Sequence, residues 1–269
     1  MADIKKLAQR LKEFDDGQKA NELSKLLWKP KEGPQTVRMV PYKFNPEVPF
    51  IELKFYYNLG GKHYLAPCTF GKPDPILEAI ETLRSSGNSE DKLVAEKLAP
   101  TTRTYAPIIV RGQEELGVRF WGFGVQVFKQ LLKVMTNPKY GHIESLSEGR
   151  DIDIEFKKIG SKRNAKGDPL PETSILVDPA ITPAVDPKRT DLMDKLRDQT
   201  DILTIFPLKS YEELKDALNK WLNPDAASDD STDPVEPAVI PEAAFSAPPT
   251  PAPTGEKIAS EFADFFNKK

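Results

Sequence analysis

Arginine and aromatic side chains alternate along both strands of a predicted β-hairpin over residues 103–123. The alternating residues are Arg103, Tyr105, Arg111, Arg119, Trp121 and Phe123. Residues two apart share one face of a strand, so each strand can present its arginines and rings together. Rings stack on unpaired bases at roughly 1–3 kcal/mol per base, whatever the base, and guanidinium groups bind phosphates. The pattern favours binding of single-stranded nucleic acid without sequence preference.

A second basic cluster lies in and beside a loop predicted at residues 160–169. It comprises Lys157, Lys158, Lys162, Arg163 and Lys166, and its charge can close over a bound strand. The alternation does not decide which face of the hairpin points outward. Val118 and Phe120 fit an outer face equally well, and Trp121 and Phe123 then belong to the core.

Motifs of familiar catalytic and nucleotide-binding sites are missing from the sequence. It contains no P-loop, GxGxxG fingerprint, nucleophile elbow or HExxH helix. The two histidines, His63 and His142, belong to no recognisable acid–base set. His63 and Cys68 could supply two zinc ligands, but further soft ligands are missing nearby, and a strand histidine with a small buried thiol is the simpler interpretation. We therefore expect a protein that is not an enzyme and binds no metal or other cofactor.

Charge is distributed unevenly along the 269 residues. The whole chain has a net charge of −3, whereas residues 225–269 hold nine acidic and three basic residues, a net charge of −6. The preceding 224 residues therefore carry a net charge of +3. The acidic pI of about 5.7 argues against nucleic acid as a partner, but a mildly basic body with an acidic tail is compatible with it.

Composition also limits the compartment in which the protein works. A single cysteine excludes an internal disulfide framework. No apolar stretch approaches the roughly 20 residues of a membrane span, and the N-terminus lacks the apolar run of a signal peptide. We expect a soluble protein of a reducing compartment that does not bind membranes.

Short strands interrupted by helices must position the basic and aromatic residues. Alternating or β-branched segments predict strands at residues 36–41, 50–57, 62–65, 104–111, 118–123, 152–156 and 173–177. Helical periodicity is found over residues 73–99, 125–135 and 188–222. Ser210 and Glu213 form a capping box at the start of the last helix. The fold class is therefore predicted to be α+β.

Both ends of the chain differ from this body. In residues 1–30, three basic residues, Lys5, Lys6 and Arg10, surround apolar residues at helical spacing. Such a segment is either a terminal helix that packs on the body or a basic arm that docks on a neighbouring molecule.

After Pro224 the periodicity is lost. Seven prolines between residues 234 and 253 indicate a disordered, extended linker. Its end interleaves apolar and acidic side chains, which is typical of a partner-binding peptide. The residues expected to contact a partner are Phe262, Asp264, Phe265 and Phe266.

Five short motifs occur in the order in which a known family has them. They are Val37-Arg38-Met39-Val40-Pro41, Gly61-Lys62-His63-Tyr64, Tyr105-Ala106-Pro107-Ile108-Ile109-Val110, Phe123-Gly124 with Phe128-Lys129, and Lys209-Ser210-Tyr211-Glu212-Glu213-Leu214. On these motifs, the chain over about residues 35–222 resembles the single-stranded-DNA-binding, helix-destabilising replication protein of T4-like bacteriophages. The acidic tail after a Pro/Ala linker also resembles the family's layout.

The resemblance implies an OB-type β-barrel with helical insertions, C-terminal helices and a disordered acidic tail. It implies three regions: residues 1–30 contact a neighbouring protomer, residues 31–223 bind DNA, and residues 224–269 recruit partners. Arg38 matches a family arginine of the DNA cleft, and Tyr105 and Trp121 match aromatic residues that line it. Arg103 and Arg119 lie beside family positions that are basic or aromatic.

The chain departs from the family pattern at the zinc site, which in the T4 protein uses one histidine and three cysteines. Cys68 matches one ligand. Where the family has a Cys-Pro-x-Cys pair, this chain has Asp74-Pro75-Ile76-Leu77. We therefore expect that zinc is lost and that apolar packing of residues 76–83 replaces it.

Taken together, these features predict sequence-independent and cooperative binding of single-stranded DNA in phage replication, recombination and repair. The expected partners are single-stranded DNA, further copies of the chain, and phage replication and recombination proteins, in the cytoplasm of an infected bacterium. Two alternatives stay open: a protein-interaction adaptor, and a regulator that binds single-stranded RNA on the same scaffold.

Overall fold

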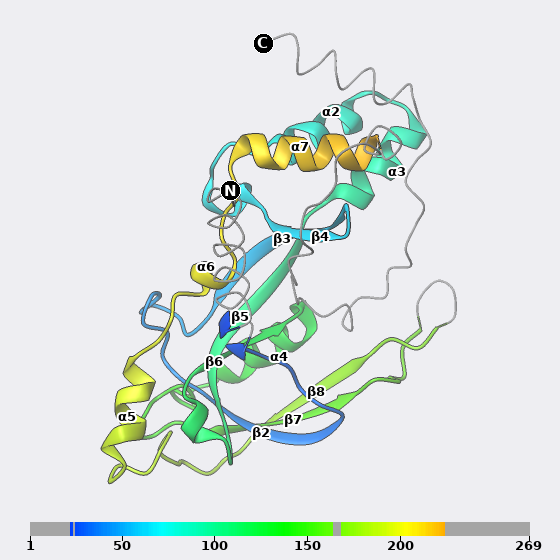
Figure 1. The fold of residues 1–269 in the computed structure, drawn as a ribbon. Helices are drawn as coiled ribbons and strands as arrows, with labels where there is room; N and C mark the ends of the chain where they lie inside the picture. The colour runs from blue at the N-terminus through cyan, green and yellow to red at the C-terminus, as the bar shows by residue number, and fades with distance from the viewer. Residues whose placement is uncertain (1–21, 24, 164–167, 224–269) are drawn as a thin grey trace, which may run out of the picture. The chain divides into compact units, whose positions relative to one another are not determined.

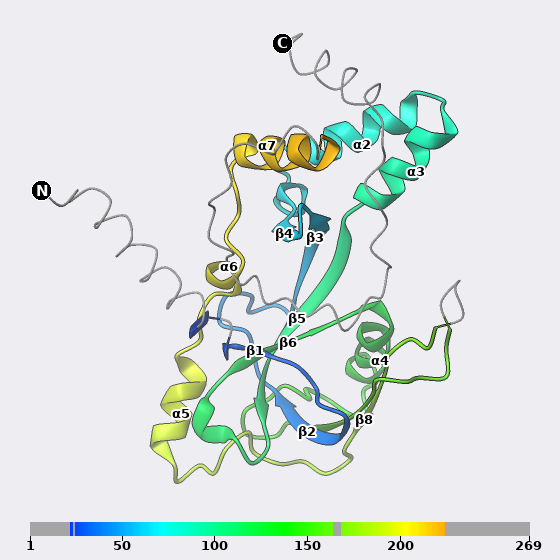
Figure 2. The same cartoon turned by 45° about the vertical axis from the view of Figure 1, so that its right-hand side comes forward.

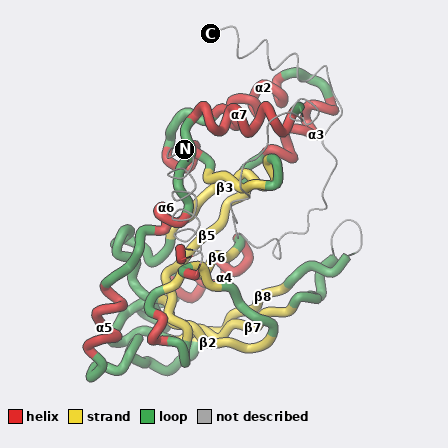
Figure 3. The backbone as a smooth tube through the Cα atoms, in the orientation of Figure 1, coloured by secondary structure: helices red, strands yellow, loops and turns green. Residues whose placement is uncertain are grey.

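The computed structural model describes residues 22–23, 25–163 and 168–223. Within these ranges the chain divides into two units (Figures 1 and 3). Residues 22–52 and 103–205 form the first unit, and residues 53–102 and 206–223 form the second. Among the described helices, none is long and apolar enough to cross a membrane. The predicted protomer contacts Lys5, Lys6 and Arg10 and the tail residues Phe262, Asp264, Phe265 and Phe266 lie outside the described residues.

A mixed, open sheet forms the first unit, so the α+β class is confirmed. Its strands, in chain order, are β1 (Leu27–Trp28), β2 (Gly33–Met39), β5 (Thr101–Val110), β6 (Arg119–Phe123), β7 (Asp151–Lys157) and β8 (Glu172–Val177). Their order across the sheet is β1-β6-β5-β2-β7-β8. The β1–β6 pair is parallel and the other neighbours on this path are antiparallel. The predicted hairpin is thus present as β5 and β6.

The inner face of this sheet is apolar because alternate residues of each strand point to the same side. It contributes Val37, Ile108, Trp121, Ile152 and further residues to one hydrophobic core. Helix α4 (Val125–Met135) places Val127 and Leu131 in that core and lies beside β8 (Figure 2). The sequence did not predict β1, a two-residue strand that adds Trp28 to the core.

Two helices after β8 complete the first unit. Helix α5 (Thr190–Arg197) packs Leu192 and Leu196 against Ile109 and Val118 in a separate cluster. Helix α6 (Ile202–Ile205) follows and buries Ile202. Because Ile109 belongs to the face opposite Ile108, part of the sheet's outer face is covered as well.

The second unit combines the hairpin of β3 (Ile51–Leu59) and β4 (Lys62–Leu65) with one short and three longer helices. The first two residues of β3 belong to the first unit. The helices are η1 (Pro67–Phe70), α2 (Pro75–Ser85), α3 (Ser89–Leu98) and α7 (Tyr211–Leu222). Helix α7 begins with the predicted capping box of Ser210 and Glu213. It lies along α2 in both views (Figures 1 and 2), with Leu214 and Leu218 in a common core with Ile76 and Ile80.

Candidate nucleic-acid interface

The outer face of β5 and β6 carries an aromatic ring laid across a glycine. Tyr105 lies directly opposite Gly122 in the antiparallel register. A Cβ atom at position 122 would lie 2.6 Å from Cε1 of Tyr105, so only glycine lets the ring take this place. Covering a strand glycine with a cross-strand aromatic ring is a recognised way to restore the packing that glycine lacks. The ring itself is buried.

Two basic residues belong to the strand ends near this pair. Arg103 shares the face of Tyr105 two residues earlier, and its Nη2 donates a hydrogen bond to the carbonyl oxygen of Gly122 at 3.1 Å. Lys29 directly follows Trp28, the last residue of β1, which is in parallel register with Trp121. The same register continued by one residue would bring Lys29 level with Gly122. Partial burial lowers the pKa of Lys29, although the residue as a whole is exposed. No sequence pattern pointed to Lys29, because the two-residue strand β1 that precedes it is too short to predict.

Trp121 and Phe123 are not on this outer face, so the structure decides between the two faces that the alternation left open. Trp121 is 2 % exposed. Its ring packs edge-on against Trp28, with ring centroids 6.1 Å apart, and against Phe123 at 4.6 Å. The face that they share is the inner one, where burial of two large rings contributes more than exposure would. Neither ring offers surface to a base in this structure.

Arg119 shares the inner face but lies at its margin. Its Nη2 donates to Oε1 of Gln113 at 2.7 Å. Within the described part of the chain, its Nε is buried without a hydrogen-bond partner. Burial also lowers the pKa of this guanidinium group. Arg119 is therefore separated from Arg103 by the thickness of the sheet.

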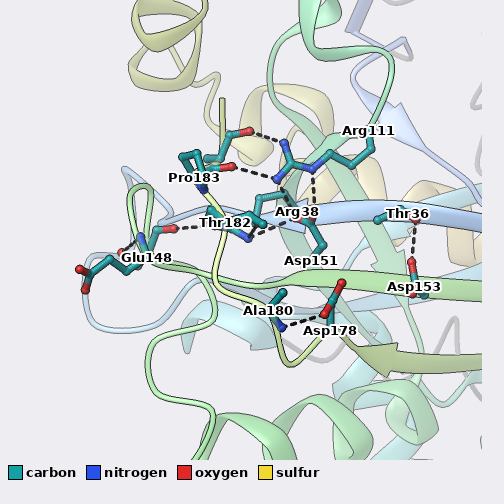
Figure 4. Close-up of polar contacts among 12 residues, drawn as sticks. Thr36, Arg38, Arg111, Glu148, Asp151, Asp153, Asp178, Ala180, Thr182 and Pro183 are labelled. Atoms are coloured by element: carbon teal, nitrogen blue, oxygen red, sulfur yellow. Dashed lines mark hydrogen bonds and ion pairs between the residues drawn. The ribbon is translucent and has the colours of Figure 1, made fainter. Parts of the chain in front are cut away.

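Arg38 and Arg111 belong to an internal ion network around Asp151 (Figure 4). Arg38 and Asp151 face each other across β2 and β7, with Nη1 and Oδ1 3.1 Å apart. Arg111 binds the same carboxylate through two hydrogen bonds, Nη2 to Oδ1 at 2.7 Å and Nε to Oδ2 at 3.0 Å. One carboxylate thus holds two guanidinium groups.

The same arginines fix the segment that follows β8. Arg38 donates to the hydroxyl group of Thr182 at 3.1 Å and to its carbonyl oxygen, and Arg111 donates to the carbonyl oxygens of Pro183 and Ala184. The Arg38 side chain is 0 % exposed. Protein groups therefore enclose the guanidinium group of Arg38 in this structure, and its predicted role in a DNA cleft stays a prediction. Arg111 is bound in the same way.

The basic loop lies between β7 and β8. Its described members Lys157, Lys158, Lys162 and Arg163 are exposed, and Lys166 lies outside the described residues. Lys157 Nζ is 3.2 Å from Oε1 of Glu155. Lys162 Nζ donates to Oε1 of Gln126 on α4 at 3.0 Å. The structure therefore places four of the five basic residues on the β7–β8 hairpin. None of these four takes part in the hydrogen bonds around Asp151.

In the second unit, the buried carboxylate of Asp74 lies where the family has its Cys-Pro-x-Cys zinc ligands. Asp74 caps α2 by accepting hydrogen bonds from the backbone N–H groups of Ile76 and Leu77. It also accepts from the hydroxyl group of Tyr56 at 2.8 Å and from the backbone N–H of Cys68 at 3.2 Å. Burial, followed by the nearby Asp74, raises the pKa of the Cys68 thiol. Among the described residues, no group of three or more His, Cys, Asp or Glu could hold a metal ion.

The sequence was compared with known proteins and protein families. A search of curated proteins gave no match. The family model described as gp32 DNA binding protein like matches residues 31–222. This range covers most of the chain and includes both structural units, so the resemblance predicted from the five ordered motifs is confirmed. The chain belongs to the gp32-like family of DNA-binding proteins.

Proposed function

We propose that the protein binds single-stranded DNA without sequence preference, through the outer face of β5 and β6. Membership of the gp32-like DNA-binding family carries this proposal. The hydrogen bond of Arg103 to Gly122 and the register that leads Lys29 toward the same part of β6 support it. We further propose that the mixed sheet of the first unit is an OB-type scaffold and that the protein acts as a binding protein rather than as an enzyme.

The charges on this face match what a DNA backbone requires. A guanidinium group and an ammonium group neutralise phosphates and release counterions, which favours binding irrespective of base sequence. Sequence readout needs hydrogen-bond donors and acceptors aimed at base edges.

The wider roles are proposed from the family resemblance. We propose cooperative binding through residues 1–30, recruitment of phage replication and recombination proteins through residues 224–269, and action in the host cytoplasm. The acidic tail would compete weakly with phosphates for the basic face, so DNA would displace it and free its tip for a partner. Residues 224–269 lie outside the described ranges, and of residues 1–30 only residues 22–23 and 25–30 are described.

A salt titration with oligo(dT) tests the central proposal. The full-length protein should bind oligo(dT) with an affinity that falls steeply as salt rises. Lys29→Ala and Arg103→Ala should each weaken binding and reduce the salt slope by about one. Arg84→Ala and Lys92→Ala are matched controls, because they remove exposed basic residues of α2 and α3 in the second unit, whereas Lys29 and Arg103 belong to the first. They should leave the slope unchanged.

The alternatives give different results in the same assay. Equal or tighter binding of poly(rU) would favour an RNA-binding regulator. Binding of neither polymer would refute the proposal and favour a protein-interaction adaptor. Normal melting temperatures for the Lys29 and Arg103 variants would exclude misfolding as the cause of weaker binding.

A further inference from the structure

The loop between β2 and β3, residues 40–50, holds an aromatic ring in solvent. Phe44 is 48 % exposed, and Val48, four residues later in the same loop, is 37 % exposed. We propose that Phe44 is a base-stacking residue for single-stranded DNA and that Lys43 binds the phosphate next to the stacked base. The proposal rests on the proposed function and extends it to a loop that the sequence analysis did not single out.

Hydrogen bonds from the segment between α5 and α6, and from the first residue of α6, hold this loop in place. Gln199 donates through Nε2 to the carbonyl oxygen of Pro41 at 2.8 Å and accepts through Oε1 from the backbone N–H of Lys43 at 3.0 Å. The hydroxyl group of Tyr42 lies 3.2 Å from Oδ1 of Asp201 and accepts from the backbone N–H of Ile202 at 3.2 Å.

The loop also closes on itself. The backbone N–H of Asn45 donates to the carbonyl oxygen of Tyr42 at 3.1 Å, and Nδ2 of Asn45 donates to the carbonyl oxygen of Phe50 at 3.0 Å. Phe44 is therefore exposed on a braced backbone rather than on a loose one. A ring fixed in this way loses little conformational entropy when a base stacks on it.

A row of aromatic rings connects Phe44 to the sheet. Phe120 lies on the outer face of β6, and its ring centroid is 5.7 Å from that of Tyr42. The centroid of Tyr42 is in turn 5.8 Å from that of Phe44. Phe120 is two residues before Gly122 on the same face of β6. The row therefore starts next to the face that carries Arg103 and Lys29, and Phe44 is its solvent-exposed end.

The charge beside the ring favours a nucleic acid as the occupant. The ammonium group of Lys43 lies 5.7 Å from the centroid of Phe44, near the outer limit of a cation–π contact. A base that stacks on the ring would displace this loosely held group, which can then reach the adjacent phosphate. Glu47 is the single acidic residue of the loop, and it should oppose the phosphate.

Binding to oligo(dT) and to an abasic oligonucleotide of equal length separates stacking from charge. Phe44→Ala should weaken oligo(dT) binding by at least about fivefold, the lower end of the effect of removing one stacking ring. It should leave binding of the abasic strand unchanged. Phe44→Tyr, which keeps the ring, should retain the affinity of the wild-type protein for oligo(dT).

Charge variants provide a second, independent readout. Lys43→Ala should weaken binding of both strands and reduce the salt slope by about one, and Glu47→Gln should strengthen binding of both. Leu116→Ala is the control, because Leu116 is an exposed apolar residue in η2 (Glu114–Leu116) that has no ring on which a base could stack. It should change neither affinity.

The outcomes distinguish this inference from the function on which it rests. If wild-type protein binds oligo(dT) and Phe44→Ala binds it equally well, the stacking role is refuted while the proposed function stands. An equal loss on oligo(dT) and on the abasic strand would refute stacking as well. If wild-type protein does not bind oligo(dT), the proposed function itself fails.

Discussion

Replacing Asp151 by alanine tests whether the internal ion network is structural. The Asp151 carboxylate accepts three hydrogen bonds from two guanidinium groups, at 2.7–3.1 Å. Without it, the fully buried guanidinium group of Arg38 loses its counter-charge. Removing one partner of a buried ion pair costs about 3–5 kcal/mol. Asp151 and Arg111 keep 17 % and 23 % of their side-chain surface exposed, so we expect the lower end, about 3 kcal/mol.

Urea unfolding measures this change in the free energy of unfolding. With a slope of about 1–3 kcal/mol per molar urea, the midpoint should fall by about 1 M or more. A Trp221→Phe background leaves Trp28 and Trp121, both in the core of the first unit, as the fluorescent reporters. The transition then reports on the unit that contains Asp151.

Asp153→Ala is the matched control on the same strand. Asp153 is exposed and accepts a hydrogen bond from the hydroxyl group of Thr36 at 2.6 Å, so its loss should cost no more than about 1 kcal/mol. The double variant Arg38→Met/Asp151→Leu should regain part of the lost stability, because no isolated charge remains at the pair. The reasoning is refuted if Asp151→Ala is no more destabilising than Asp153→Ala.

Four further predictions follow from burial and charge. Trp121→Ala should lower the free energy of unfolding, measured in urea, by about 3–5 kcal/mol. Trp121→Phe should retain the affinity for DNA. If a stable Trp121→Phe variant loses binding selectively, the Trp121 ring belongs to the interface after all. Burial raises the pKa of Tyr42 from 10.0 to about 12, so the folded state should lose stability as the pH rises from 10 to 12, and Tyr42→Phe should remove that part of the pH dependence. The raised pKa of Cys68 predicts slow alkylation by iodoacetamide at neutral pH, and Asp74→Ala should speed it; equal rates would exclude Asp74 as a cause. Deleting residues 225–269 should strengthen oligo(dT) binding at low salt and leave it unchanged at high salt, because salt screens the tail's charge.

Local sequence patterns were sufficient to predict most elements. Alternation predicted the β5–β6 hairpin, and the stripe of Ile76, Ile80 and Leu83 predicted a helix that the structure buries in the core of the second unit. Ser210 and Glu213 predicted a helix start correctly. These features depend on residues a few positions apart, so the sequence determines them directly. The ordered motifs predicted the family in the same way.

Positions of single side chains in the candidate site depended on long-range contacts. Arg38 was predicted to face a cleft because its neighbours match a family motif. In the structure its guanidinium group is buried and bonded to the carboxylate of Asp151, 113 residues later. Trp121 fits either face by alternation, and its packing with Trp28, from a strand too short to predict, decides the inner one.

The sequence by itself determined the α+β class, the order of strands and helices, the family and the uneven charge. Only the tertiary structure decided which arginines are exposed and which aromatic rings stay accessible. Burial of an arginine depends on a carboxylate from a distant strand, because a guanidinium group leaves water only where hydrogen bonds and a counter-charge replace it. Tyr42 and Phe44 illustrate the same dependence. They are two residues apart, yet distant partners bury one ring, and the other stays in solvent.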